Sequence, residues 1–163
     1  MRLVVLIDNC TINGRNLKGE GGASYYIDED KKFLLDTGAS GLFMENAKNL
    51  DINLDDIDTV VLSHGHYDHA GGLKDFIESR DDKINIICHP LSFNKKKKGN
   101  TNMGAPYRKD EIIKLANVNF SDKPVKVSKN VTYLGQIPYT VDFENRKLMG
   151  EIEIDGEYKD DYI

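Results

Sequence analysis

The chain has 163 residues, 39% hydrophobic and 30% charged, which is enough apolar material for one globular core and excludes a disordered tail. No run reaches the roughly 18 consecutive apolar residues of a membrane helix, and the apolar start meets Asp8 too early for a signal peptide. We therefore expect a cytoplasmic protein with no membrane partner. Cys10 and Cys88 form no Cys-x-x-Cys pattern, which excludes a disulfide framework and a four-cysteine metal site.

The formal net charge of −5 is concentrated at the end of the sequence. Residues 151–163 hold six acids against one lysine, so the first 150 residues balance at 21 acids and 21 bases. This balance argues against a general nucleic-acid-binding surface, and we expect no nucleic acid partner.

The predicted elements begin with short strands and then alternate with helices. Apolar and β-branched runs predict strands at 2–7, 23–27, 32–35, 59–62, 84–88, around Val125 and at 131–134. Helices are expected from Ser40, a candidate N-cap, to about Leu50, near 72–79 and near 109–116, and the segment 147–158 alternates like a strand. This order predicts an α/β layered fold with a mixed sheet in a single domain over 1–163.

Three of the four histidines lie within six residues, directly after the predicted strand at 59–62, in the run Ser-His-Gly-His-Tyr-Asp-His-Ala-Gly-Gly. Imidazole and carboxylate suit zinc, iron or manganese, and a loop that leaves a strand can turn alternate side chains inward. We expect Gly65 to ease the turn between ligands. The predicted metal ligands are His64, His66, Asp68 and His69, with one or two zinc ions preferred and iron or manganese as alternatives.

The pattern His-x-His-x-Asp-His resembles the signature of the metallo-β-lactamase superfamily, and the residues that flank it resemble that superfamily too. Segments 19–24, 33–38 and 135–144 resemble, in order, the subfamily of metal-dependent hydrolases related to dihydropterin ribofuranosyl-aminobenzene phosphate synthase. The resemblance implies a metallo-β-lactamase-like αββα sandwich. It also implies one metal on His64 and His66, a second on Asp68 and His69, and Asp36 orienting the motif loop from behind.

The resemblance covers only the first part of the family pattern. Members of the subfamily continue for about another half domain, which supplies a later ligand histidine, a bridging acid and a final histidine, and we found no such segments here. We therefore expect a sandwich truncated after its first half and completed by another chain or by a homo-oligomer, for example a swapped or symmetric dimer.

The resemblance and the ligand set together imply a metal-dependent hydrolase that directs a metal-activated water at a small, anionic ester or phosphoester. Asp68 is assigned a catalytic role in positioning that water. The basic run Lys95–Lys98 is interpreted as a lid that attracts anions, against the plainer interpretation of a solvated loop. The candidate substrate-pocket residues are His89, Lys97, Tyr107 and Arg108.

Two other functions remain open at this stage. The main alternative is a non-catalytic metal-binding half domain that needs a partner chain or dimerisation. A weaker one is iron-dependent oxygen or sulfur chemistry, since imidazole and carboxylate ligands accept several first-row ions.

Overall fold

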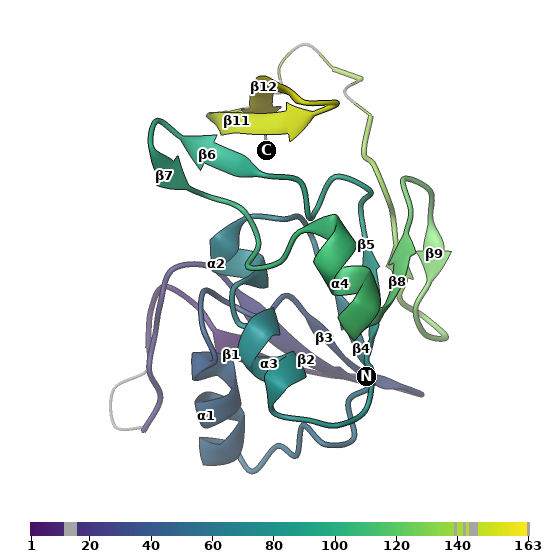
Figure 1. The fold of residues 1–163 in the computed structure, drawn as a ribbon. Helices are drawn as coiled ribbons and strands as arrows, with labels where there is room; N and C mark the ends of the chain where they lie inside the picture. Colours follow the sequence, from purple (N-terminus) through teal and green to yellow (C-terminus); the bar gives the residue numbers. More distant parts are fainter. Residues whose placement is uncertain (12–15, 139, 142, 144–146, 163) are drawn as a thin grey trace.

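A computed structural model describes the chain except for residues 12–15, 139, 142, 144–146 and 163 (Figure 1). Its main sheet has six strands in the order β1-β2-β3-β4-β5-β8. The first three strands are antiparallel, and β3, β4, β5 and β8 run parallel. This mixed sheet confirms the predicted α/β class. The strands are β1 (Arg2–Ile7), β2 (Ser24–Asp28), β3 (Lys32–Leu35), β4 (Thr59–Val61), β5 (Asn85–Cys88) and β8 (Asn117–Phe120).

Helices α1 (Leu42–Asn49), α3 (Leu73–Glu78) and α4 (Lys109–Leu115) lie on the same side of this sheet (Figure 1). Their apolar residues join the sheet in one buried cluster, which includes Phe43, Phe76 and Ile112. The rings of Phe43 and Phe76 meet edge to face, with centroids 5.8 Å apart. This cluster is the main core, and it fixes the ends of the parallel strands from which the motif loop leaves.

The opposite face of the sheet also carries buried apolar side chains. Successive strand residues point to opposite sides, so neighbours in one strand can join different clusters. Phe33 joins a second, smaller cluster on this face, whereas its neighbour Leu34 belongs to the main core. A ribbon of β9 (Val125–Lys126) and β10 (Thr132–Tyr133) contributes to its cover through the adjoining Val127. On β1 the cover ends, since Leu3 and Val5 are 53% and 46% exposed.

A separate antiparallel sheet of four strands lies beyond the ends of the parallel strands (Figure 1). Its order is β12 (Glu157–Tyr162), β11 (Leu148–Ile154), β6 (Lys96–Lys98) and β7 (Thr101–Asn102). The basic run interpreted as a loop is therefore mostly strand β6, because it pairs with β7 on one side and β11 on the other.

Most predicted elements are present, with small shifts at their ends. The first helix begins at Leu42 rather than at Ser40, although the Ser40 hydroxyl still accepts the Leu42 amide at 3.2 Å. The segment 147–158, predicted as one strand, is divided between β11 and β12. Strands β7 and β8 and the short helix α2 (Tyr67–Ala70) were not predicted. Cys10 and Cys88 are free thiols. Across the described parts of the chain, no helix is both long and apolar enough to span a membrane.

Candidate metal centre

Asp36 directly follows strand β3, and its carboxylate holds the motif loop. Oδ1 accepts the Ser63 amide at 2.7 Å, while Oδ2 accepts the Ser63 hydroxyl at 2.6 Å and the Nδ1–H of His69 at 2.8 Å. The residue is only 2% exposed, and its φ of 57° lies in the left-handed region, which aspartate adopts more readily than most residues. One buried carboxylate thus binds both ends of the motif.

Each motif histidine has one ring nitrogen engaged by a neighbouring side chain. Metal-binding histidines are commonly oriented in this way, with the other nitrogen left for the ion. The Ser63 hydroxyl donates to Asp36, so its oxygen accepts from His64 Nδ1 and Nε2 of that ring carries no proton. The three pairs are His64 Nδ1 with Ser63 Oγ at 2.9 Å, His66 Nε2 with Asp161 Oδ2 at 2.9 Å, and His69 Nδ1 with Asp36 Oδ2 at 2.8 Å.

Three of the four predicted ligands converge. His64, Asp68 and His69 each offer a ligand atom, and these atoms all lie within 4.8 Å of one another. The ring of His66 lies beside them, with its centroid 4.9 Å from that of His64. This donor set of imidazoles and carboxylate, with free nitrogens on oriented rings, fits a first-row divalent ion.

The charge state of His64 suits this chemistry, because an imidazole must be neutral to bind a metal. Burial, reinforced by the nearby rings of His69 and His66, lowers the pKa of His64 to about 4. Burial also opposes a proton on His69, but the hydrogen bond and charge of Asp36 outweigh it and raise the pKa of His69. His64 is therefore neutral near pH 7 before any metal arrives.

An acid from the far end of the described chain reaches the same site. Asp161 in β12 lies 2.9 Å from His66 across 95 residues of sequence, and the two residues are 9% and 4% exposed. Burial alone would raise the pKa of Asp161, but the hydrogen bond to His66 and the charge of Lys96 lower it. Asp161 was not predicted, because the acidic, alternating end of the sequence does not show which acid faces the motif.

Two glycines allow close backbone contact with the motif loop. A Cβ on Gly65 would lie 1.8 Å from the carbonyl oxygen of Ser92, and one on Gly22 would lie 1.7 Å from that of Asp68. Gly65 was expected to ease a turn between the ligands, whereas in the structure it makes room for the 89–94 segment. That contact places the residues after β5 against the histidines.

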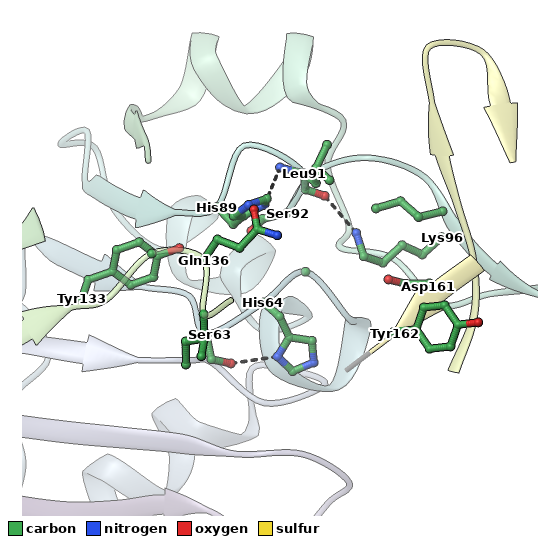
Figure 2. A pocket seen from close by; sticks show the side chains of 14 residues that line it. Ser63, His64, His89, Leu91, Ser92, Lys96, Tyr133, Gln136, Asp161 and Tyr162 are labelled. Carbon is green, nitrogen blue, oxygen red and sulfur yellow. Dashed lines mark hydrogen bonds between the residues drawn. The ribbon is translucent and has the colours of Figure 1, made fainter. Parts of the chain in front are cut away.

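A cavity of about 690 Å³ opens beside His64 and is lined also by His89, Lys96 and Asp161 (Figure 2). His89 accepts the Leu91 amide at Nδ1, 3.2 Å away, so the neutral ring carries its proton on Nε2 and can donate it. Lys96 is 5% exposed and donates to the carbonyl oxygen of Leu91 at 2.9 Å. Burial lowers the pKa of Lys96 to about 8.

The other three predicted pocket residues lie elsewhere. Lys97, Tyr107 and Arg108 line a different cavity, of about 680 Å³, whose lining does not include His64 or His89. Arg108 precedes helix α4, where its backbone N–H donates to Glu111 at 2.7 Å. The Lys97 ammonium lies 3.5 Å from a carboxylate oxygen of Glu151. Of the predicted pocket residues, the structure thus brings only His89 to the histidine cluster.

Comparisons with known proteins agree with this architecture. An uncharacterized protein of Methanocaldococcus jannaschii is 31% identical over 144 residues, which are 86% of this chain and 55% of that protein. The 7,8-dihydropterin-6-methyl-4-(beta-D-ribofuranosyl)-aminobenzene-5'-phosphate synthase of the same organism is 36% identical over 78 residues, 44% of this chain and 26% of the synthase. The chain therefore spans about half, or less, of the length of these relatives.

Among solved structures, Tm1679, a metal-dependent hydrolase of the beta-lactamase superfamily, superposes with a TM-score of 0.77 at 29% identity. The match covers 98% of this chain and 56% of Tm1679. The Rm3 metallo-beta-lactamase shares the fold, with a TM-score of 0.51 at 17% identity over 71% of this chain and 45% of that one. The family model described as Metallo-beta-lactamase superfamily matches residues 17–134. The chain belongs to the metallo-beta-lactamase superfamily.

Proposed function

We propose that the protein is a metal-dependent hydrolase of a small, anionic ester or phosphoester. The observation that carries this proposal is the convergence of His64, Asp68 and His69, of which His64 also lines a cavity of about 690 Å³. A cavity of this size admits a small-molecule substrate next to His64. Tm1679, which is described as a metal-dependent hydrolase, supports the reaction class.

The chain's own residues divide the work. His64, His66, Asp68 and His69 hold the ion, for which zinc is our first choice and iron or manganese are alternatives. When bound, such an ion supplies Lewis acidity and lowers the pKa of a water molecule. The Asp68 carboxylate also positions that water. His89 can donate its Nε2 proton to a substrate oxygen, since its Nδ1 already accepts a hydrogen bond.

We also propose that a second layer covers the sheet face opposite the helices, supplied by a complementing chain or by a homo-oligomer. The support is that Leu3 pairs with Ile27, which pairs with Phe33, so the three side chains share one apolar face. That face is closed at Phe33, 1% exposed, and open at Leu3, 53% exposed.

We also propose a reducing, cytoplasmic location, which the free thiols of Cys10 and Cys88 support.

The test is hydrolysis of p-nitrophenyl acetate, p-nitrophenyl phosphate and bis(p-nitrophenyl) phosphate by protein loaded with zinc, manganese or iron. We expect turnover that a chelator abolishes, that metal restores, and that is lost in Asp68→Asn while circular dichroism is unchanged. Metal-loaded protein that hydrolyses none of the three substrates above the buffer rate would refute this proposal and favour the non-catalytic metal-binding alternative. Native mass spectrometry of the same samples gives the subunit count, and a monomer would contradict the homo-oligomer and leave only the complementing chain.

A further inference from the structure

The basic run around β6 separates into two sets of side chains, because successive residues of a strand face opposite ways. Lys95 and Lys97 reach outward to β11, where their ammonium groups lie 3.0 Å from Glu153 and 3.5 Å from Glu151. Lys96, between them, turns inward and is 5% exposed. Its register partner Ile152 is also buried, at 6%, so this position faces the interior of the molecule.

The ammonium of Lys96 is only partly satisfied by the protein. It donates to the Leu91 carbonyl oxygen at 2.9 Å, whereas an ammonium has three N–H donors. Within the part of the chain that the structure describes, no carboxylate forms an ion pair with it. Asp161, whose charge acts on the Lys96 ammonium, is already hydrogen-bonded to His66. A buried cation is costly unless it is paired, so this arrangement favours an anion in the cavity.

The position of Lys96 relative to the metal centre defines what that anion can be. Figure 2 shows its ammonium between Leu91 and Asp161, and His64 lines the same cavity. His89 lines the cavity as well and offers a second N–H donor. Carboxylate and phosphate oxygens both accept from such donors, so either group can lie here while the bond to be cleaved lies at the histidines.

We propose that Lys96 binds the anionic group of the substrate, a carboxylate or a phosphate, and so sets the preference of this site for anionic over neutral esters. The inference rests on the proposed hydrolase function and adds the residue and the part of the cavity that recognise charge. It replaces Lys97, Tyr107 and Arg108 in that role, because Lys96 lines both their cavity and the cavity of His64, whereas those three residues line only the former.

The experiment compares Lys96→Gln with the matched control Lys97→Gln. The glutamine at 96 keeps an N–H donor for Leu91 but removes the charge. The readout is the ratio of kcat/KM for an anionic ester, mono-p-nitrophenyl glutarate or p-nitrophenyl phosphate, to kcat/KM for neutral p-nitrophenyl acetate. We expect this ratio to fall about 10- to 100-fold in Lys96→Gln, mostly through KM, and to stay within about 2-fold of wild type in Lys97→Gln. Loss for glutarate alone identifies a carboxylate site, and loss for phosphate alone a phosphate site.

Equal losses on anionic and neutral esters in Lys96→Gln would overturn the proposal, because they indicate a structural role. Lys96→Arg retains the charge and must retain the anionic preference, which keeps the test decisive if Lys96→Gln does not fold. Calorimetric binding of inorganic phosphate to the metal-loaded protein separates the two proposals. Phosphate affinity that depends on Lys96 without any turnover would refute the hydrolase but retain the anion site. If the protein turns over esters, but Lys96→Gln changes neither phosphate affinity nor ester preference, the hydrolase function is retained and the anion site at Lys96 is refuted.

Discussion

Two regions of the molecule hold the same histidine cluster in different ways. On one side, Asp36 at the end of β3 accepts three hydrogen bonds from the motif, and its partners lie within 33 residues of it. On the other side, Asp161 of β12 makes a single contact with His66 across 95 residues. The first support belongs to the six-stranded sheet, and the second belongs to the four-stranded sheet.

The two regions also differ in how they are anchored. The six-stranded sheet lies under the main buried cluster, whereas within the four-stranded sheet Ile152 is the one buried apolar residue of strands β6, β7, β11 and β12. Its neighbouring contacts are partly exposed ion pairs such as Lys97 with Glu151, which contribute about 0–1 kcal/mol. Local opening begins where apolar burial is least. The His66 side of the centre is thus the more easily disturbed side.

Removing a metal ligand gives the largest expected loss of zinc affinity. It tests whether the histidines that Asp36 and Asp161 support form a metal centre. His69→Ala is expected to weaken zinc affinity by more than about 100-fold, since loss of a supporting residue alone costs about 10–100-fold. Competition with a chromophoric chelator measures this. His89→Ala, outside the cluster, is the control and is expected to bind zinc as wild type does. Unchanged zinc affinity in His69→Ala would contradict the assignment of the metal site to this loop.

Core substitutions sharpen the difference in anchoring. Phe43→Ala is expected to lower the free energy of unfolding by about 3–5 kcal/mol, because Phe43 is fully buried in the main cluster. Ile152→Val removes one methylene and is expected to cost about 0.5–1.5 kcal/mol. Urea unfolding measures both, and hydrogen exchange is expected to show faster exchange in β11 and β12 only for Ile152→Val. If Ile152→Val instead speeds hydrogen exchange equally in both sheets, the two sheets open together.

The two supporting carboxylates can be compared directly. Asp36→Asn and Asp161→Asn are each expected to reduce zinc affinity by about 10–100-fold, with Asp36→Asn at the upper end because three hydrogen bonds change instead of one. Asp36→Asn is also expected to lower the thermal midpoint more. A larger loss of affinity in Asp161→Asn would reverse this ranking and make strand β12 the principal support of the centre.

The smallest expected effect concerns a contact that ties the sheet to the ribbon. Glu29 accepts hydrogen bonds from Ser128 and Asn130, and these lower the pKa of Glu29 from 4.5 to about 2. A depressed carboxylate pKa adds stability that is present above pH 4.5 and is lost as the pH falls toward 2. Glu29→Gln is expected to make the thermal midpoint slightly less dependent on pH between about 4.5 and 2. An unchanged pH profile in this variant would show that the contact contributes nothing.

The difference between the regions also explains what could be predicted from sequence. The motif and Asp36 are local signals, since a histidine cluster follows one strand and an Asp-Thr-Gly turn follows another. The pocket lysine is Lys96 and not the predicted Lys97, because nothing in a run of four lysines shows which one faces inward until its pairing with β11 is known. Asp161 depends on the same long-range pairing. Strand β8, with two asparagines in four residues, lacks a strong strand pattern and is defined by its parallel partner β5.

The most direct test of the central claim is X-ray absorption at the zinc edge of the zinc-loaded 163-residue chain. The account predicts nitrogen and oxygen neighbours at about 2.0–2.1 Å, with the outer-shell scattering of imidazole rings, and a loss of part of that scattering in His64→Ala. A spectrum with oxygen neighbours alone, or one that is identical in wild type and His64→Ala, would contradict a metal centre built on the histidine motif.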